Sequence, residues 1–465
     1  MTASRLRRDS RERCGEKSSK TKQPCFWFRL SALLGLNLEY VPNYSWSKIR
    51  ERKVDMNDRY SISAYLCFLL LVLTACQSLI PTPAPQDPNE YLENALNWIQ
   101  THAVFGDRVN WEVIRRQALA YVNNPQTTAE TYPAIRYVLG HIFDDNSGFT
   151  EPGAITPADE EYIGIRFYGA NHTVIYVDPN SPADKAGVRV GDIGVSYEDV
   201  PSESIVRLTL CRVEQAESID FVLHKIAPPA NANQPDPTGR RIATQKDWVG
   251  YIELPPNSGS LEYPGTYPGR IHQIMRKLDR TPVCGWIVDL RRNDWGDIWS
   301  YLAALGPILG EGDVGGFLYP DNTHELWSYR DGKVFWADNE RYESLVEGGI
   351  YTPKREMPPV ALLTSHATTA AGELVIVAFQ GREKVHTFGE PTRGLPMLIV
   401  QTLLSDGVQI VMSGAYATDR NGTSYKDPIY PDENIPTHWS QFGTVQDPVI
   451  LAALDWLNTQ PECGN

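Results

Sequence analysis

The chain has 465 residues, of which 42% are apolar and 22% are charged, a composition that suits two or three globular domains. Its formal net charge of -14 does not favour a nucleic acid as a partner, because phosphate binding requires a basic face. The sequence contains no Cys-x-x-Cys pair and no His-Glu-x-x-His motif, so we predict neither a metal site nor a cofactor.

The first part of the chain is predicted to be a targeting segment. Residues 1–55 have no usable period, and we interpret them as an overcalled translation start. From Met56 a short charged region leads into an apolar stretch that is too short to span a bilayer stably and is typical of a secretory signal. It ends in Leu73-Thr-Ala-Cys, which resembles a bacterial lipobox. The resemblance implies a signal peptide at residues 56–76.

In proteins with that signal the cysteine is lipidated, so Cys76 would hold the chain on a membrane surface. We therefore expect an extracytoplasmic location in the cell envelope. The alternative is a single N-terminal transmembrane anchor. Residues 77–87 contain Pro-Thr-Pro-Ala-Pro and are predicted to form a semi-rigid tether.

A helical subdomain is predicted for residues 88–150. Asp87 and Pro88 are typical of an N-cap and a first helical position, and apolar residues at helical spacing follow. A second helix is predicted for residues 111–122. Thr127-Thr-Ala-Glu matches a capping box and predicts a third helix, which runs to about Ile142.

Residues 157–228 resemble a PDZ domain of the bacterial protease type. The resemblance rests on Tyr162-Ile-Gly-Ile-Arg-Phe, on Ser181-Pro-Ala-Asp-Lys-Ala-Gly and on the following Gly191-Asp. It implies a site for a polypeptide or a C-terminal peptide, in which the backbone of Ile163, Gly164, Ile165 and Phe167 receives the terminal carboxylate and the adjoining strand pairs with the peptide. The alternative is a rigid spacer without a ligand.

The largest predicted domain spans residues 240–460. Apolar runs predict strands at 248–254, 285–291, 360–363, 384–388, 398–403 and 408–416, and helical patterns occur at 269–278, 373–379 and 448–458. We therefore expect a multidomain α/β or α+β protein. Cys284 lies in one of the strand-like runs and is interpreted as a small core residue, while the pairing of the cysteines stays open.

The stretch from Pro358 to Gly394 predicts a buried strand, a tight turn and a helix. Such an elbow exposes the residue at the turn, and a helix N-terminus favours negative charge. The turn Thr368-Thr-Ala-Ala-Gly-Glu, followed by Gly389-Glu-Pro-Thr-Arg-Gly, resembles the tail-specific (C-terminal processing) serine peptidases. The resemblance implies the spiral ββα core of that family. It also places Ala370 where the family has its nucleophilic serine.

Other motifs of the family are only partly present. Asp289-Leu-Arg-Arg-Asn corresponds to the start of the loop that supplies oxyanion donors, but Trp295 replaces the first of its two glycines and Gly296 is the second. Asn146 stands where tricorn-like members have a catalytic histidine, and Leu395 where members with a serine and lysine dyad have the lysine. The resemblance therefore implies a degenerate serine peptidase.

The elbow contains other residues that could act as a nucleophile or a base. Ser365 and His366 are adjacent, but neighbouring side chains on an extended chain point to opposite faces. No neighbouring base is evident that could take a proton from Thr368 or Thr369. For Asp289 and Arg291 we favour a structural role at the end of a strand. Three hypotheses follow: a tail-binding degenerate peptidase, an active serine peptidase, and a structural envelope lipoprotein.

Overall fold

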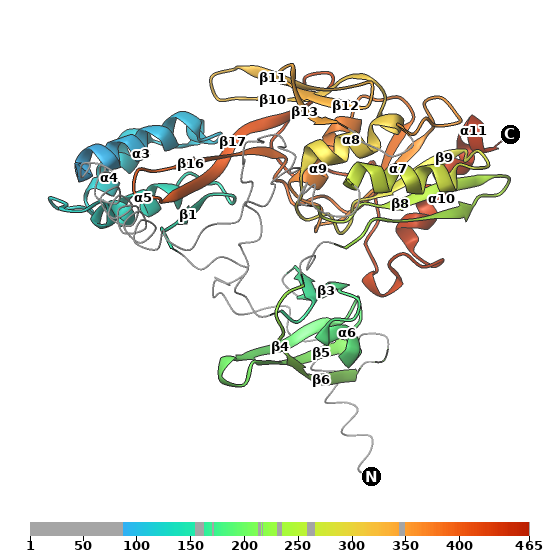
Figure 1. Ribbon diagram of the computed structural model, residues 1–465, viewed down its shortest axis with the longest axis horizontal. Coiled ribbons are helices and arrows are strands. Elements are labelled where there is room, and N and C mark those ends of the chain that lie inside the picture. The colour runs from blue at the N-terminus through green and yellow to red at the C-terminus, as the bar shows by residue number, and fades with distance from the viewer. Residues whose placement is uncertain are drawn as a thin grey trace, which may run out of the picture. The chain divides into compact units, whose positions relative to one another are not determined.

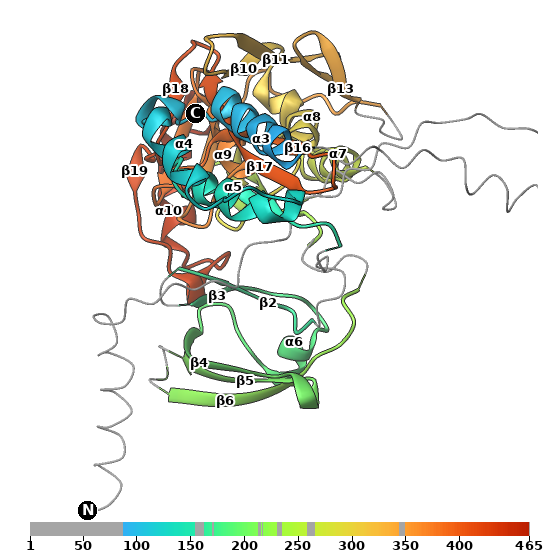
Figure 2. The ribbon, with the colours of Figure 1, turned by 90° about the vertical axis from the view of Figure 1, so that its left-hand side faces the viewer.

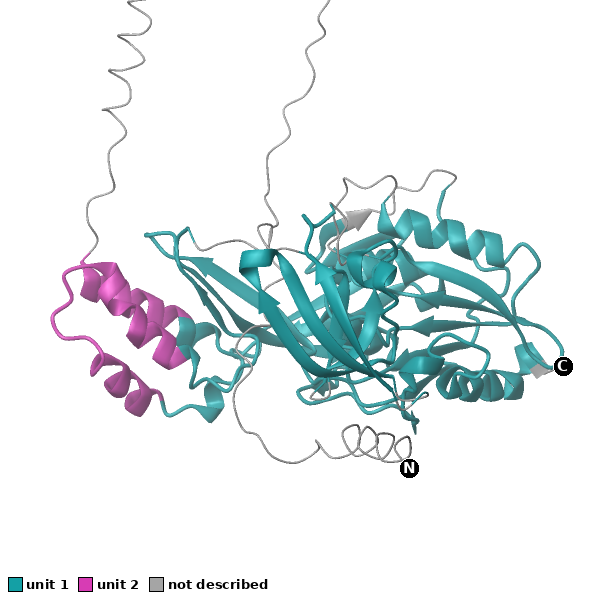
Figure 3. Cartoon of the chain, turned by 90° about the horizontal axis from the view of Figure 1, so that it is seen from below, with its two compact units in different colours: residues 1–32, 99–110, 139–465 teal, residues 33–98, 111–138 magenta. Residues whose placement is uncertain are grey.

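The computed structural model describes residues 87–153, 162–169, 172–212, 215, 217–229, 235–257, 266–343 and 349–464. The predicted signal peptide, Cys76 and nearly all of the tether lie outside these residues. The described chain forms two compact units, coloured separately in Figure 3. Residues 87–98 and 111–138 belong to the smaller unit, and the other described residues belong to the larger one.

The smaller unit is helical, as the sequence predicts. The helices that contribute to it are α3 (Pro88–His102), α4 (Trp111–Leu119) and α5 (Tyr132–Leu139). The carboxylate of Asp87 accepts a hydrogen bond from the backbone N–H of Asn89, at 2.9 Å, as expected for an N-cap.

The predicted capping box does not form, and this detail of the prediction is wrong. The side chain of Thr127 makes no capping bond, and a 3-10 helix, η2 (Thr128–Thr131), precedes α5. The carboxylate of Glu130 instead accepts the backbone N–H of Gln126, at 2.8 Å. The glutamate therefore stabilises the turn before the helix instead of the predicted cap.

A five-stranded antiparallel sheet follows in the larger unit, with α6 beside its strands (Figure 2). Its strands pair in sequence order, so β2 lies at one edge and bonds only with β3 in the described sheet. Ser181 caps α6 by accepting the backbone N–H of Asp184. The elements are β2 (Ile165–Tyr168), β3 (Thr173–Val177), α6 (Pro182–Ala186), β4 (Ile193–Val200), η4 (Pro201–Glu203), β5 (Ile205–Arg212) and β6 (Glu217–His224).

A six-stranded sheet forms the centre of the core, in the order β19-β15-β14-β9-β8-β7 (Figure 1). All its strands are parallel except β7 at one edge. The strands are β7 (Thr238–Ala243), β8 (Trp248–Glu253), β9 (Gly285–Asp289), β14 (Val360–Thr364), β15 (Val385–Gly389) and β19 (Glu433–Asn434).

Helices cover both faces of this sheet, because alternate strand residues point to opposite sides. In β14, Val360 and Leu362 pack in one cluster with residues of α7, α8 and α9, whereas Ala361 and Leu363 pack with residues of α10. These helices are α7 (Tyr267–Leu278), α8 (Ile298–Leu309), α9 (Ala371–Phe379) and α10 (Pro448–Thr459), and α11 (Pro461–Gly464) follows. The elbow therefore lies between the central strand and a buried helix.

An eight-stranded antiparallel sheet completes the larger unit. β17 is its longest strand and pairs with β1, β10, β16 and β18. The strands are β1 (Gly148–Thr150), β10 (Gly312–Leu318), β11 (His324–Arg330), β12 (Lys333–Trp336), β13 (Asn339–Glu343), β16 (Met397–Leu403), β17 (Gln409–Asp419) and β18 (Ser424–Tyr425), and the short helices η1 (Gly106–Arg108) and η6 (Trp439–Gln441) lie elsewhere in the unit.

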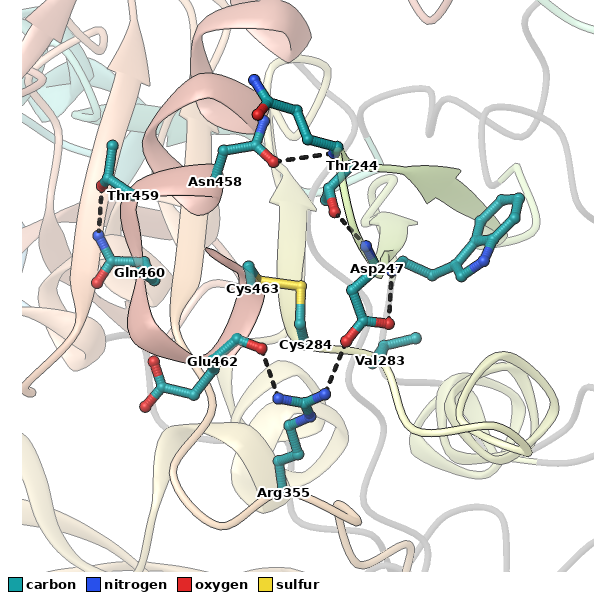
Figure 4. The surroundings of a disulfide bond; sticks show 12 residues. Thr244, Asp247, Val283, Cys284, Arg355, Asn458, Thr459, Gln460, Glu462 and Cys463 are labelled. Carbon is teal, nitrogen blue, oxygen red and sulfur yellow. Dashed lines mark hydrogen bonds and ion pairs between the residues drawn. A yellow bond between two sulfur atoms is a disulfide. The ribbon is translucent and has the colours of Figure 1, made fainter. Parts of the chain in front are cut away.

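A disulfide joins Cys284 to Cys463 inside the core (Figure 4). Cys284 is buried, as expected, but the interpretation of it as a simple core residue is incomplete because it is cross-linked. Beside it, Arg355 donates to the carboxylate of Asp247 at 2.7 Å and to the backbone oxygen of Glu462. The C-terminal end of the described chain is thus tied to the central sheet.

Candidate active site

Ala370 occupies a strained turn between β14 and α9. Its backbone angles are φ 49° and ψ -115°, in a region where residues other than glycine are uncommon. A nucleophile elbow of a hydrolase has the same character, a sharp strand-to-helix turn that presents one side chain. The structure therefore places Ala370 at the tip of an elbow, and this tip carries only a methyl group.

Glu373 stabilises the elbow through hydrogen bonds of its side chain. Its buried carboxylate accepts the backbone N–H groups of Ala370, Gly394 and Leu395 at 3.0, 2.7 and 2.9 Å, and the hydroxyl of Thr392 at 2.5 Å. Burial raises the pKa of Glu373 above its ordinary value, although these four hydrogen bonds oppose the shift. One side chain thus fixes the turn and the loop that follows it. This role of Glu373 is not apparent from the sequence alone.

The elbow is also bonded to the loop after β9. The N–H of Thr369 donates to the backbone oxygen of Asn293 at 3.0 Å, and the hydroxyl of Ser365 donates to that of Arg291 at 2.6 Å. At Gly372, a Cβ atom would lie 2.7 Å from the oxygen of Asn293, so only glycine permits this approach. The two motifs that are distant in sequence form one site.

The loop after β9 has its positive backbone angle at Gly296, where φ is 151°. Trp295 is not among the described residues with positive φ, so its bulky side chain is compatible with the backbone at that position. A Cβ atom on Gly296 would lie 2.3 Å from the hydroxyl of Tyr301. Glycine is thus required at the second position, and tryptophan is tolerated at the first.

Asn146 belongs to a polar network on β17. Its side-chain amide donates to the hydroxyl of Ser413 at 2.9 Å, and its backbone N–H donates to the carboxylate of Asp144 at 2.9 Å. Asp144 also accepts the backbone N–H and the hydroxyl of Ser413. The amide nitrogen of Asn146 is committed as a donor, so this side chain cannot take a proton from a nucleophile.

Comparison with known proteins assigns the family. Residues 248–435 match the model described as "Peptidase family S41". By this match, the core is similar to peptidase family S41. A chloroplastic C-terminal processing peptidase of Tetradesmus obliquus is 23% identical over 333 residues, which cover 65% of this chain and 68% of that protein. The nisin-resistance protein of Lactococcus lactis is 30% identical over 182 residues, 38% of this chain and 50% of that protein.

Solved structures support the same fold. The crystal structure of mature CPAF matches with a TM-score of 0.50 and 11% identity, over 81% of this chain and 98% of that one. At this identity the match shows the fold alone. The predicted resemblance and the mixed α/β fold class are thereby confirmed.

Within this core, two of the three substitute nucleophiles, Ser365 and Thr368, are committed to structural bonds. Ser365 is fully buried; besides donating to Arg291, its hydroxyl accepts the N–H of Ala367 at 3.0 Å. Thr368 is also buried, and its hydroxyl donates to the oxygen of Leu290 at 2.9 Å. His366 is exposed, whereas Ser365 is not, which agrees with the predicted divergence of their side chains. The third, Thr369, has a buried hydroxyl that finds no hydrogen-bond partner among the described residues.

Asp289 and Arg291 form a buried ionic network with Asp447, the N-cap of α10. Arg291 donates to Asp289 at 3.0 and 2.6 Å and to Asp447 at 3.0 and 2.8 Å, and all three side chains are at most 1% exposed. Burial alone would raise the pKa of Asp289, but Arg291 holds it below its ordinary value. The charged atoms of these groups are hydrogen-bonded to one another and are not available to a substrate. The geometry agrees with the favoured structural role.

The predicted peptide-binding segment includes β2, a half-buried strand at one edge of the five-stranded sheet. Gly164 has φ 80°, and a Cβ atom there would lie 2.2 Å from that of Ser181, so glycine is required. The backbone oxygen of Ile163 accepts the N–H of Ala183 at 3.1 Å. From β2, Arg166 donates to Asp294 in the loop after β9, at 2.7 Å. This contact was not predicted, since its partners are 128 residues apart.

Proposed function

We propose that this chain binds polypeptide tails in the cell envelope without hydrolysing them. The observation that carries the proposal is Ala370, which lies at the sharp strand-to-helix turn where the family resemblance implies a nucleophilic serine. A methyl group cannot attack a carbonyl carbon, so the first step of serine-peptidase chemistry has no agent here.

The proposal is supported by the other positions that the family resemblance makes catalytic. Asn146 and Leu395 occupy the places of the alternative bases, and neither side chain accepts a proton at neutral pH. A nucleophile, its base and the oxyanion donors act as one unit, so the loss of several members leaves little activity. Trp295 is a further departure from the family's pattern, because it replaces the first of the two glycines in the oxyanion loop.

Binding is assigned to residues 157–228, interpreted as a PDZ-like domain. β2 is an edge strand, and Ile165 and Phe167 on it pack beside the core of the five-stranded sheet. An extended peptide can add to such an edge as a further strand, while the backbone around Ile163 and Gly164 receives its terminal carboxylate. A single domain of this kind binds with dissociation constants of roughly micromolar size, about -8 kcal/mol.

The location follows from the N-terminal sequence and the disulfide. Leu73-Thr-Ala-Cys suggests lipid on Cys76, which lies outside the described residues. The buried Cys284–Cys463 bond is of the kind that forms and persists in oxidising compartments. None of the described helices has the length and apolar character needed to cross a bilayer.

The function is tested with the purified full chain and C-terminal peptides that end in an apolar residue. We expect saturable binding by calorimetry and no cleavage of the same peptides or of unstructured protein. Phe167→Ala should weaken binding, whereas Val222→Ala on β6 of the same sheet is the matched control and should not. Cleavage by the unmodified chain, or affinity unchanged by Phe167→Ala, would overturn the proposal.

Lipidation is tested separately in a bacterial host with labelled palmitate. The wild-type chain should become labelled and membrane-associated, and Cys76→Ala should lose both properties. Cys67→Ala, in the apolar stretch of the same signal, is the control and should keep them. A soluble, unlabelled wild-type chain contradicts the assignment.

A further inference from the structure

Two arginines lie together at the C-terminal end of α9 without a carboxylate partner. Arg382 is 5% exposed, and its guanidinium donates to the backbone oxygens of Glu383 and Pro358, each at 2.8 Å. Arg420 donates to the backbone oxygen of Ala378 at 2.9 Å. In the part of the chain that the structure describes, neither forms a salt bridge, and each has a buried Nε atom without an acceptor.

Asp419 precedes Arg420 in the sequence but forms no salt bridge with either arginine among the described residues. The carboxylate of Asp419 accepts the backbone N–H groups of Asn421 and Thr423 at 2.8 and 2.9 Å, and the hydroxyl of Tyr425 at 3.1 Å. The carboxylate of Asp419 therefore stabilises the turn between β17 and β18. The charge of Asp419 attracts Arg420 and raises its pKa, against the effect of burial, but the two side chains form no direct salt bridge in the described part of the chain.

The local electrostatics reflect two neighbouring positive charges. Burial and, to a smaller extent, the charge of Arg420 lower the pKa of Arg382 to about 10. Burial likewise lowers the pKa of Arg420. Capping of the last carbonyls of α9 explains some of the guanidinium hydrogen bonds. It does not compensate two charges, and buried charges are ordinarily paired.

A neutral donor lies at the same place. A Cβ atom on Gly381 would be 2.3 Å from the side-chain nitrogen of Asn421, so this amide lies against the backbone that precedes Arg382. Two guanidinium groups and an amide are the donors that bind an oxyanion through charge-assisted hydrogen bonds. The overall charge of -14 makes an unneutralised basic pair more unusual.

We propose that Arg382, Arg420 and Asn421 form a binding site for a small oxyanion. The site lies at the opposite end of α9 from Ala370, about 13 Å along a nine-residue helix. It is therefore separate from the elbow and does not depend on the proposed binding of polypeptide tails. A free phosphate ion and a carboxylate group share the required chemistry, and the test distinguishes them.

The test measures the thermal unfolding temperature of the full chain against the concentration of inorganic phosphate, and of acetate, at constant ionic strength. We expect a saturable rise of a few degrees with the preferred anion. A response to phosphate alone identifies a free phosphate, and an equal response to acetate identifies a carboxylate. Both results support the site. No saturable rise with either anion overturns it.

Variants separate binding from the general stabilisation that excluded salts cause. Arg420→Gln should lose the saturable rise, and Arg420→Lys, which keeps the charge, should retain a weaker one. Arg330→Gln is the control, because it removes a half-exposed arginine paired with Asp313 elsewhere on the surface. An equal rise in Arg420→Gln and wild type contradicts the proposal. If Arg420→Gln does not fold, direct titration calorimetry of wild type and Arg420→Lys decides.

Discussion

The backbone N–H of Ala370 donates a 3.0 Å hydrogen bond to the carboxylate of Glu373, three residues further along the chain. The same carboxylate binds the loop at Gly394 and Leu395. The strained turn is thus maintained by a buried acid that lies outside the nucleophile position. This bond holds the sharp strand-to-helix turn around a residue that carries only a methyl group.

The first prediction concerns the strain at Ala370. Its φ of 49° is costly for an alanine and free of cost for a glycine. We expect Ala370→Gly to raise the free energy of unfolding by about 1 kcal/mol, after the greater chain entropy of glycine is subtracted. Urea unfolding measures the change.

The neighbouring residue is a matched control for this substitution. Ala371 begins α9 and has ordinary helical geometry, so Ala371→Gly should lower the free energy of unfolding by roughly 0.5–1 kcal/mol. Equal losses in both variants would show that the turn at Ala370 is not strained.

The second prediction is that restoring the serine does not restore catalysis. Ala370→Ser supplies a nucleophile, but Asn146 donates its amide to Ser413 and Leu395 is apolar, so no base takes the proton. In a well-studied hydrolase the loss of one such group lowers turnover by roughly a millionfold. We expect no labelling by a fluorophosphonate probe and no peptide cleavage.

Labelling should appear first in a variant that also carries Asn146→His and Trp295→Gly, because these changes return the base and the glycine. Labelling of the single Ala370→Ser variant at the rate of an active serine peptidase would mean that an unidentified base is present.

The sequence predicted the strand, turn and helix of the elbow because these are local patterns. α8 was missed because it is buried on nearly every side and contains Gly306 and Pro307, so it has neither an amphipathic period nor an uninterrupted helical composition. The role of Glu373 was missed for another reason. It depends on hydrogen bonds to residues about twenty positions away, and such contacts follow from the fold and not from spacing.

The third prediction concerns the disulfide. Cys284 and Cys463 are 179 residues apart, so their bond restricts a long loop in the unfolded chain. Loop entropy and the loss of buried sulfur predict that replacing both cysteines by alanine lowers the free energy of unfolding by about 3–5 kcal/mol. A reductant should destabilise the wild type by a similar amount and should have a smaller effect on the double variant. Equal effects of the reductant on both chains would contradict this role.

The last prediction concerns acid stability and His272, which lies buried on α7. Its Nε2 is within 3.2 and 3.1 Å of the backbone oxygens of Ala303 and Ala304, so this nitrogen carries the proton of a neutral ring. Burial lowers the pKa of His272 from 6.5 to about 4. Below pH 6.5 the unfolded chain therefore binds a proton that the folded chain does not, and stability falls with pH until about pH 4. The loss attributable to this group reaches about 3 kcal/mol.

His272→Gln keeps an N–H donor but does not titrate, so urea unfolding at pH 7 and pH 5 should show a smaller difference than in wild type. His366→Gln, which removes an exposed imidazole, is the control and should retain the wild-type difference; the same difference in all three chains would rule out His272 as the acid-sensitive group.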